Sequence, residues 1–261
     1  MFHFLKHNDF WEAVKEHELW LYLARQDIRL RYRRSKIGPF WITLSMTVFI
    51  VTLGVVYSKL FNVDIKEYLP FLASGFIIWT FISGMLTEMP NLFVDNAGYI
   101  KDIKMNPISI VFRMATRHLI ILGHNIVIMI GVYFYFEINP GYSIILLLPS
   151  TVIVMMNLIS IGIALSVIGV RFRDVAPMTQ SVVQILFFIT PLMWFPRLLS
   201  VDSWIVIANP FAHFLDIMRS PILGQQPELH SWFVSVITLS IFSFISLIVY
   251  KNKSHNIPHW V

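Results

Sequence analysis

Six stretches of this chain run for 19 or more residues without an Asp, Glu, Lys or Arg. They cover residues 37–58, 68–87, 118–136, 138–170, 175–196 and 229–250. About 20 apolar helical residues cross the hydrocarbon core of a bilayer. The pattern therefore predicts a membrane protein that crosses the bilayer six times. It argues against catalysis on a large hydrophilic domain and leaves transport, channel activity or membrane-embedded catalysis.

The composition supports a membrane protein, because 56% of the 261 residues are hydrophobic and only 13% are charged, and the length of the apolar stretches predicts an all-α one. We predict a cytoplasmic amphipathic interface helix over residues 1–36, a transmembrane domain over 37–250 and a cytoplasmic tail over 251–261. The predicted transmembrane helices are 37–58, 68–88, 112–136, 142–170, 176–196 and 229–250. Short extracytoplasmic helices are expected between the fifth and sixth helices.

The Lys and Arg residues are distributed unevenly between the two sides of these helices. If the N-terminus is cytoplasmic, 16 of the 20 basic residues lie in the inner segments. The outer segments keep Lys59, Lys66, Arg197 and Arg219. An excess of Lys and Arg marks the cytoplasmic side. The distribution therefore predicts that both chain ends lie in the cytoplasm.

Residues 8–36 are amphipathic and precede the first predicted crossing. Apolar residues recur at helical spacing on one face: Phe10, Val14, His17, Leu21, Ala24 and Ile28. The segment ends in a basic run that contains Arg29, Arg31, Arg33 and Arg34. Such a helix lies in the membrane interface with its cations near anionic lipid heads. The basic run is either an anchor alone or also a ring that guides an anionic substrate into the protein.

Two of the segments that connect the predicted membrane helices are expected to contain helical structure of their own. The inner loop 91–107 is polar but periodically apolar, which predicts a short helix across the membrane face. That helix either docks on a partner or packs on its own bundle. In the outer segment 197–228, residues 203–215 are apolar but too short to cross, and so are interfacial or re-entrant. This segment is interpreted as an outer cap or gate, or as a plain extracytoplasmic loop.

The sequence lacks the motifs that would let this chain hydrolyse ATP or couple transport to an ion gradient by itself. It has no G-x-x-x-x-G-K-[ST] loop to hold ATP and no His-Glu-x-x-His motif. It also has no Cys for a thiolate metal site, and no convincing catalytic set. Ion-coupled carriers usually place Asp, Glu or Lys at mid-membrane depth, and the six stretches contain none. A transporter of this kind needs a partner that supplies energy.

Aromatic residues make up 15% of the chain. Several of them are candidates to line a path for a glycan, because aromatic faces can stack on sugar rings: Trp41, Tyr57, Phe76, Trp79, Phe187, Phe188 and Trp194. The alternative for each is ordinary packing in the core or against lipid.

Several segments together resemble one known family. Residues 27–41 (DIRLRYRRSKIGPFW) look like the start of the first span in polysaccharide export permeases of the type-2 ABC transporters. Similarity to two further signatures of that family lies in residues 169–175 (GVRFRDV) with 188–194 (FITPLMW), and in 209–211 (NPF) with 215–219 (LDIMR). The order and spacing match over nearly the whole chain. The resemblance includes the O-antigen exporters of the Wzm type, with capsule and teichoic acid exporters as close relatives.

The resemblance implies a permease without enzymatic activity of its own, in the inner membrane of a bacterium. It implies a homodimer with two separate ATPase subunits, which bind ATP and Mg, while this chain binds no cofactor, metal or nucleic acid. Loop 91–107 would be the coupling helix that contacts the ATPase through Asp95, Tyr99, Lys101, Asp102 and Lys104. The substrate would be a lipid-linked glycan such as O-antigen, as in lipopolysaccharide biosynthesis.

Other functions remain open at this point. The same architecture could export teichoic acid, capsule or small hydrophobic drugs. A membrane scaffold in glycan assembly that transports nothing is a third alternative. The requirement for ATP hydrolysis by a partner separates the scaffold from the transporters.

Overall fold

A computed structural model describes residues 9–31, 33, 35–38, 40–196 and 204–261. Within these residues the chain is all helical, with no β-strand. The helices are α1 (Asp9–Lys15), α2 (His17–Arg31), α3 (Phe40–Leu60), α4 (Ile65–Glu88), η1 (Met89–Asn91), α5 (Leu92–Asp95), α6 (Ala97–Lys101), α7 (Pro107–Phe136), η2 (Gly141–Leu146), α8 (Leu147–Arg171), α9 (Val175–Ile189), α10 (Trp204–Ile207), α11 (Pro210–Ile222), α12 (Leu229–Lys253), η4 (Ser254–Asn256) and α13 (Ile257–Trp260).

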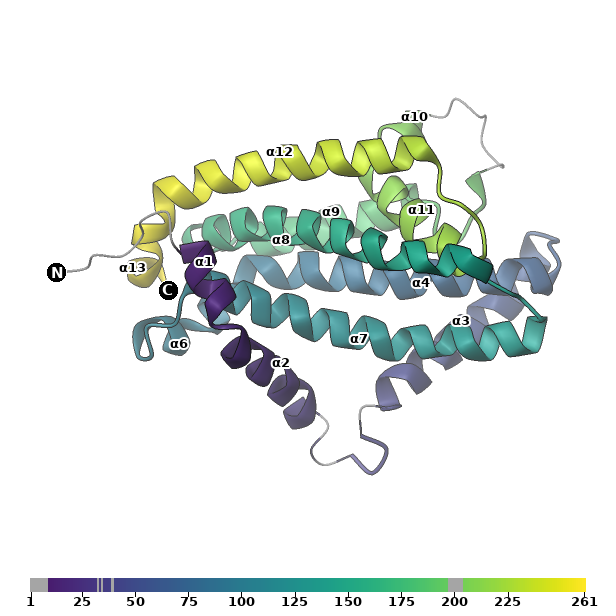
Figure 1. Ribbon diagram of the computed structural model, residues 1–261, viewed down its shortest axis with the longest axis horizontal. Coiled ribbons are helices and arrows are strands. Elements are labelled where there is room, and N and C mark those ends of the chain that lie inside the picture. The colour runs from purple at the N-terminus through teal and green to yellow at the C-terminus, as the bar shows by residue number, and fades with distance from the viewer. Residues whose placement is uncertain (1–8, 32, 34, 39, 197–203) are drawn as a thin grey trace.

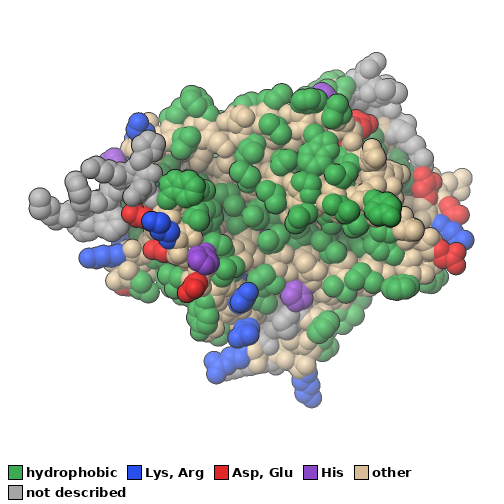
Figure 2. Space-filling view, viewed as in Figure 1, with side chains coloured by type: hydrophobic (Ala, Val, Ile, Leu, Met, Phe, Trp, Pro, Cys, Tyr) green, Lys and Arg blue, Asp and Glu red, His purple; other side chains and the backbone are tan. Residues whose placement is uncertain are grey.

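The long helices run side by side along the longest axis of the molecule (Figure 1). One end of this bundle carries α1, α6, α13 and the C-terminus, and we call it the basal end (Figure 1). The distal end carries the α3–α4 and α7–α8 connections. In Figure 2, hydrophobic side chains dominate the middle of the visible face, while charged side chains gather toward its two ends and its lower edge. This banding fits a bundle that crosses a bilayer along its long axis.

In the described part of the chain, five helical segments are long and apolar enough to cross a membrane. They are Phe40–Leu60, Ile65–Asp95, Pro107–Phe136, Gly141–Arg171 and Leu229–Trp260. The remaining predicted stretch, 176–196, contains only the shorter apolar helix Val175–Ile189. Of the six predicted membrane helices, five are therefore long enough to cross, and the helix in 176–196 is shorter than a full crossing needs.

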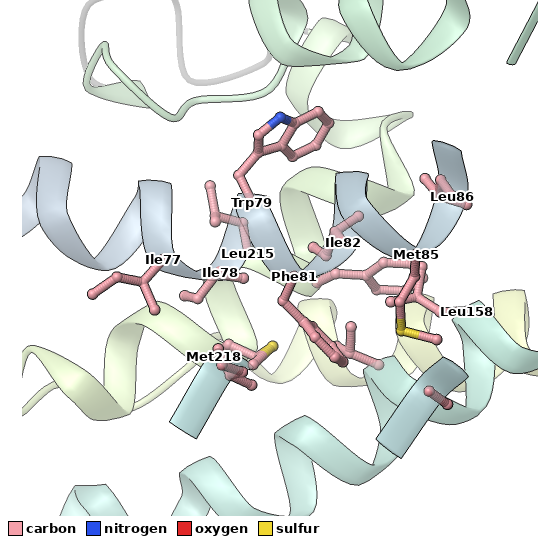
Figure 3. Packing of buried hydrophobic residues seen from close by; sticks show 14 of the residues in the cluster. Ile77, Ile78, Trp79, Phe81, Ile82, Met85, Leu86, Leu158, Leu215 and Met218 are labelled. Carbon is pink, nitrogen blue, oxygen red and sulfur yellow. The ribbon is translucent and has the colours of Figure 1, made fainter. Parts of the chain in front are cut away.

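Helix α4 forms the centre of the bundle, with 83% of its most apolar window buried. It packs against α3, α7, α8, α9 and α11. Figure 3 shows how α4 fills this position: Phe81 and Met85 point to one side, where Leu158 of α8 lies, while Trp79 points to the opposite side. An apolar helix buried all round belongs at the core of a bundle, because its neighbours shield every face.

Helix α8 approaches η1 closely through three small residues, Gly162, Ser166 and Gly169. A Cβ atom at Gly169 would overlap the carbonyl oxygen of Pro90, and one at Gly162 would overlap the side chain of Met89. The Ser166 Oγ donates a hydrogen bond to the Met89 carbonyl at 2.8 Å. Small residues allow helix backbones to approach in this way. They fix where the chain turns out of α4 into the loop that follows.

The predicted N-terminal helix is present as two helices with a break at Glu16. Helix α2 buries Ala24 and Ile28, as the apolar periodicity predicts. Phe10 and Val14 of α1 are exposed instead, as is His17 at the start of α2, while Ala13 is fully buried. The break rotates α1 relative to α2, so a single helical stripe does not continue across it. The side chain of Trp20 bridges the break by donating to the Ala13 carbonyl at 2.9 Å.

The segment between the fifth and sixth predicted crossings contains a helix inside the bundle. Helix α11 packs against α4, α8 and α12 and buries ten of its residues. Its distal end is tied to α7, because the Tyr133 hydroxyl donates to the Ile222 carbonyl at 2.7 Å. Residues 197–203, the first part of the predicted cap, lie outside the described residues.

Candidate functional site

Five ionisable side chains from three helices meet at the basal end, and we call them the basal network: Asp27 of α2, Glu88 of α4, and Arg113, Arg117 and His118 of α7. The Arg113 guanidinium donates to both carboxylate oxygens of Asp27, at 2.5 and 2.9 Å. Arg117 donates to Asp27 at 3.2 Å and also pairs with Glu88. The His118 Nε2 lies 3.0 Å from the other Glu88 oxygen. Bidentate pairs of this kind fix orientation as well as supplying energy.

The basal network is only partly screened by water. The side chains of Asp27, Arg113 and Arg117 are each 13–15% exposed, and that of Glu88 is 31% exposed. Arg113 and Arg117 share the carboxylate of Asp27, so the loss of either ion pair changes the local charge around the other. The network therefore ties α2, which lies at the edge of the bundle, to α4 at its centre.

The loop that follows α4 is joined to the basal network. The Arg113 guanidinium lies over the Tyr99 ring, 4.8 Å from its centroid. It also donates to the Asn96 side-chain oxygen at 3.4 Å. A cation over an aromatic face is held by the ring quadrupole. These contacts join α6 to Arg113, and through Asp27 they join it to α2.

Helix α1 is tied to the same end of the bundle by polar contacts. The Asn106 side chain caps α7 by accepting from the Ile108 amide at 2.9 Å, and donates to the Asp9 carbonyl at 2.7 Å. The Ser109 hydroxyl donates to Glu16 at 2.5 Å. Burial raises the pKa of the Asp9 carboxyl, and the charge of Glu12 adds to the rise, while a hydrogen bond from Tyr250 opposes it. Together these contacts attach α1 to α7 and to the end of α12.

The loop 91–107 presents both charged and apolar groups to the outside. Four of its predicted partner-contacting residues are exposed: Asp95, Lys101, Asp102 and Lys104. The fifth, Tyr99, is half-buried under Arg113. Ile103 stands among the charged residues and is 66% exposed. The predicted short helix is present as the two pieces α5 and α6, which bury Leu92, Phe93 and Ile100 against the bundle.

The predicted basic run follows the end of α2. Arg29, Arg31 and Arg33 are exposed, while Arg34 lies outside the described residues. None of the three takes part in the basal network. Their charges are therefore presented to whatever surrounds this edge of the molecule.

The structure brings four of the seven predicted path-lining aromatics together. Phe187 of α9 lies 5.8 Å from Phe76, 6.1 Å from Trp79 and 5.3 Å from Phe188, centroid to centroid. Phe76 and Trp79 are buried, whereas Phe188 is 66% exposed. Trp41 is 50% exposed on α3, and Tyr57 and Trp194 are half-buried outside this group. The ring cluster runs from an exposed face of α9 into the core.

Sequence reasoning missed the basal network, although each member is visible in the sequence. Arg113 and Arg117 have i, i+4 spacing and share one face of α7. Their partner Asp27 lies 86 and 90 residues away in the chain, so no local spacing links them. Among the described residues, no group of three or more His, Asp or Glu side chains is arranged to hold a metal ion.

Comparison with known proteins shows which protein family this chain resembles in sequence. Residues 18–223 match the sequence model of the ABC-2 type transporter family. The O-antigen export system permease protein RfbA of Klebsiella pneumoniae is 23% identical over 240 residues, which are 87% of this chain and 91% of that protein. A second protein of that name from the same organism is 22% identical over 246 residues, which are 91% and 93% of the two chains.

Proposed function

The chain belongs to the ABC-2 type transporter family, and on that premise we propose that it exports a lipid-linked polysaccharide of the O-antigen type across a bacterial inner membrane. Membership makes it the transmembrane component of the transporter, without a catalytic domain, working with an ATPase subunit. The observation that carries the substrate proposal is the similarity to two O-antigen export permeases over at least 87% of this chain and 91% of theirs. A match of that extent takes in most of the chain.

The proposed assembly is a homodimer of this chain with two ATPase subunits, which bind ATP and Mg. The basal end would face the cytoplasm, with both chain ends inside, because the basic residues concentrate there. Helix α9 together with residues 190–196 would be the fifth crossing, since α8 and α12 run in the same direction and need a connection between them. The domain limits remain 1–36, 37–250 and 251–261.

We propose that the ATPase docks on loop 91–107 at the basal end. The exposed residues Asp95, Lys101, Asp102 and Lys104 offer charges of both signs, and Ile103 offers an apolar contact at their centre. Interfaces of this kind combine a small apolar core with a polar rim. Tyr99 then lies behind the docking surface and in front of Arg113.

The basal network gives this docking surface a route into the membrane helices. Movement of α6 would act on Arg113 through Tyr99 and Asn96. Arg113 would act on α2 through Asp27, and Asp27 and Arg117 would carry the displacement to Glu88 of α4. Helix α4 contacts every membrane helix except α12 among the larger packing pairs. A push on the loop would therefore reach the helices that surround a substrate.

The glycan is proposed to pass beside α3 and α9, near Trp41, Tyr57, Phe76, Trp79, Phe187, Phe188 and Trp194. The exposed face of α9 supports this path, because it carries Gln180, Ser181 and Gln184 as well as Phe188. Polar side chains in a membrane helix face a partner helix or a wet cavity rather than lipid.

The test of the proposed function is loss of the chain in its own cell. Deletion should leave the lipid-linked glycan in the cytoplasmic leaflet, and transport should return with the wild-type chain only when its ATPase can hydrolyse ATP. Normal surface glycan after deletion would contradict the substrate proposal and leave teichoic acid, capsule or a small hydrophobic drug as cargo. Rescue by an ATPase that cannot hydrolyse ATP would indicate a scaffold in glycan assembly.

A further inference from the structure

Helix α9 ends before it has crossed a full bilayer. Its 15 residues span about 22 Å at 1.5 Å per residue, whereas the hydrocarbon core is about 30 Å thick. The chain continues as the unwound segment, residues 190–193, which has no regular helix. The carbonyl groups of such a segment lack helical partners. Inside a membrane each unsatisfied group is strongly unfavourable, because no water is there to pair with it.

Side chains from two other helices satisfy the unwound segment. The Tyr68 hydroxyl of α4 donates to the Met193 carbonyl at 2.8 Å. The Asn209 side chain, at the start of α11, donates to the Thr190 hydroxyl at 2.9 Å. The largest contribution comes from Arg219 of α11, which donates to the Pro191 carbonyl at 2.8 Å and to the Leu192 carbonyl at 3.5 Å.

The surroundings of Arg219 fit this task. Its guanidinium lies over the Phe71 ring of α4, 3.9 Å from the centroid. Gly75 makes room for it, because a Cβ there would overlap a guanidinium nitrogen and lie 3.1 Å from the Leu192 oxygen. The nearby carboxylate of Asp216 accepts instead from the Ser220 hydroxyl and from the Glu228 amide. The positive charge of Arg219 is therefore directed at carbonyl oxygens.

We propose that Arg219 is a positioning residue that latches the unwound segment of α9 against α4 and keeps it closed to water from the distal side. The planar fork of arginine presents several N–H groups at once, so it can hold two successive carbonyls, whereas lysine is a point charge. Opening the segment exchanges these hydrogen bonds for water. This inference rests on the proposed function only in placing the segment beside the transport path.

The absence of cysteine from the chain allows a direct test. We would replace the fully buried Leu192 by Cys and use the assembled transporter in sealed vesicles with the distal end outward. The rate of modification by a membrane-impermeant maleimide is measured without substrate or ATP. Arg219→Met should raise this rate by about tenfold or more, because hydrogen bonds to a charged group are lost. Arg219→Lys should raise it less.

The matched control is His213→Phe. His213 is also buried in α11, but its hydrogen bonds go to Ser231 and to the Ile207 carbonyl, outside the unwound segment. An unchanged rate in this control, with a raised rate in Arg219→Met, supports the latch. An equal rise in both variants, or no rise in Arg219→Met, overturns it.

Gly75→Ala provides the same test if Arg219→Met does not accumulate. The added methyl group would overlap a guanidinium nitrogen of Arg219 and crowd the Leu192 oxygen, so it disturbs the contact between them without removing the arginine. A faster modification supports the latch, and an unchanged rate overturns it. Because the readout needs no substrate, failure of the latch is distinguishable from failure of the proposed glycan export.

Discussion

At the basal end, charged side chains of α2, α4 and α7 are paired with each other, whereas at the distal end Tyr68, Asn209 and Arg219 donate to the backbone and hydroxyl of an interrupted helix. The basal charges lie where water still reaches them in part. The distal groups are buried, and their partners come from the protein alone. Partial exposure to water thus accompanies ion pairs at the basal end, and burial accompanies hydrogen bonds to the backbone at the distal end.

The difference bears on how each end can move. Ion pairs that retain some exposure can exchange partners with water more easily than fully buried groups can, so in the proposed mechanism the basal network is the part that rearranges. A buried guanidinium on carbonyl groups has no such substitute until water enters. A basal end that adjusts and a distal end that opens or stays shut are what a transporter driven from one side requires.

Gly169→Ala is expected to have the largest effect, and it tests whether the basal end depends on backbone contact as well as on charge. The new Cβ would overlap the Pro90 carbonyl oxygen, which cannot move aside as a flexible side chain can. We expect a loss of about 3 kcal/mol or more in the free energy of unfolding, measured by thermal unfolding in detergent.

The matched controls are two other glycines. Gly162→Ala should be less harmful, because it meets the flexible side chain of Met89, and Gly131→Ala should have almost no effect, because nothing lies within 4 Å. Equal losses in all three variants would mean that the close approach to Pro90 does not decide the result, because the higher helix propensity of Ala would by itself stabilise each variant.

Disruption of the basal network should have the next largest effect. Asp27→Asn and Arg113→Gln should each lower the free energy of unfolding by about 2 kcal/mol, less than for a fully buried pair because both side chains retain some exposure. The double variant should lose little more than either single one, since the two residues are direct partners. Strictly additive losses would show that the pair does not act as a unit.

The effect of Asp27→Asn on transport shows whether the basal network only stabilises the fold or also transmits movement from the ATPase to the membrane helices. In the proposed mechanism, Asp27→Asn leaves ATP hydrolysis by the assembled transporter nearly unchanged but lowers the glycan exported per ATP. A parallel fall in both rates would instead indicate a defect in assembly. ATP hydrolysis and export in the same vesicles check this expectation.

The sequence predicts the helical class and most of the long helices, because charge-free length alone decides them. It predicts Ala24 and Ile28 as buried but places Phe10 and Val14 on the same face, since no residue signal marks the break at Glu16. It does not predict the ends of α9 and α11. Those depend on Asn209 reaching Thr190 and on Arg219 reaching Pro191, which are contacts over 19 and 28 residues.

Arg219 shows the limit of counting charges. By position in the chain it belongs to an outer loop, and the charge distribution groups it with the few outer basic residues. In the structure it is buried in α11 over Phe71. The sequence signal for this burial is the apolar run 203–215 that precedes Arg219. Its length, too short for a crossing, is the only property that marks it as interfacial or re-entrant.

Ile103→Gln should have a moderate effect confined to the proposed ATPase contact. Ile103 is 66% exposed, so its replacement should not change stability. Loss of an apolar contact at the centre of the interface should weaken ATPase binding by about tenfold, which corresponds to about 1.4 kcal/mol. Ile145→Gln is the control, because Ile145 is 67% exposed but lies in η2 at the distal end. Equal weakening by both variants would contradict docking on loop 91–107.

The smallest effect is expected from the exposed arginines of α2, and it distinguishes their two interpretations. Arg29→Gln with Arg31→Gln should weaken the attraction between α2 and anionic lipid by about 1 kcal/mol per charge, an effect that salt reduces, measured as the enrichment of anionic lipid around the reconstituted protein. If these arginines are only an anchor, wild type and variant should transport equally well in vesicles of neutral lipid, because neither is attracted to the headgroups there. If they guide an anionic substrate, the variant should keep a raised KM in neutral lipid. Lys59→Gln with Lys66→Gln, at the distal end, should change neither quantity, because the anionic substrate would approach from the basal side.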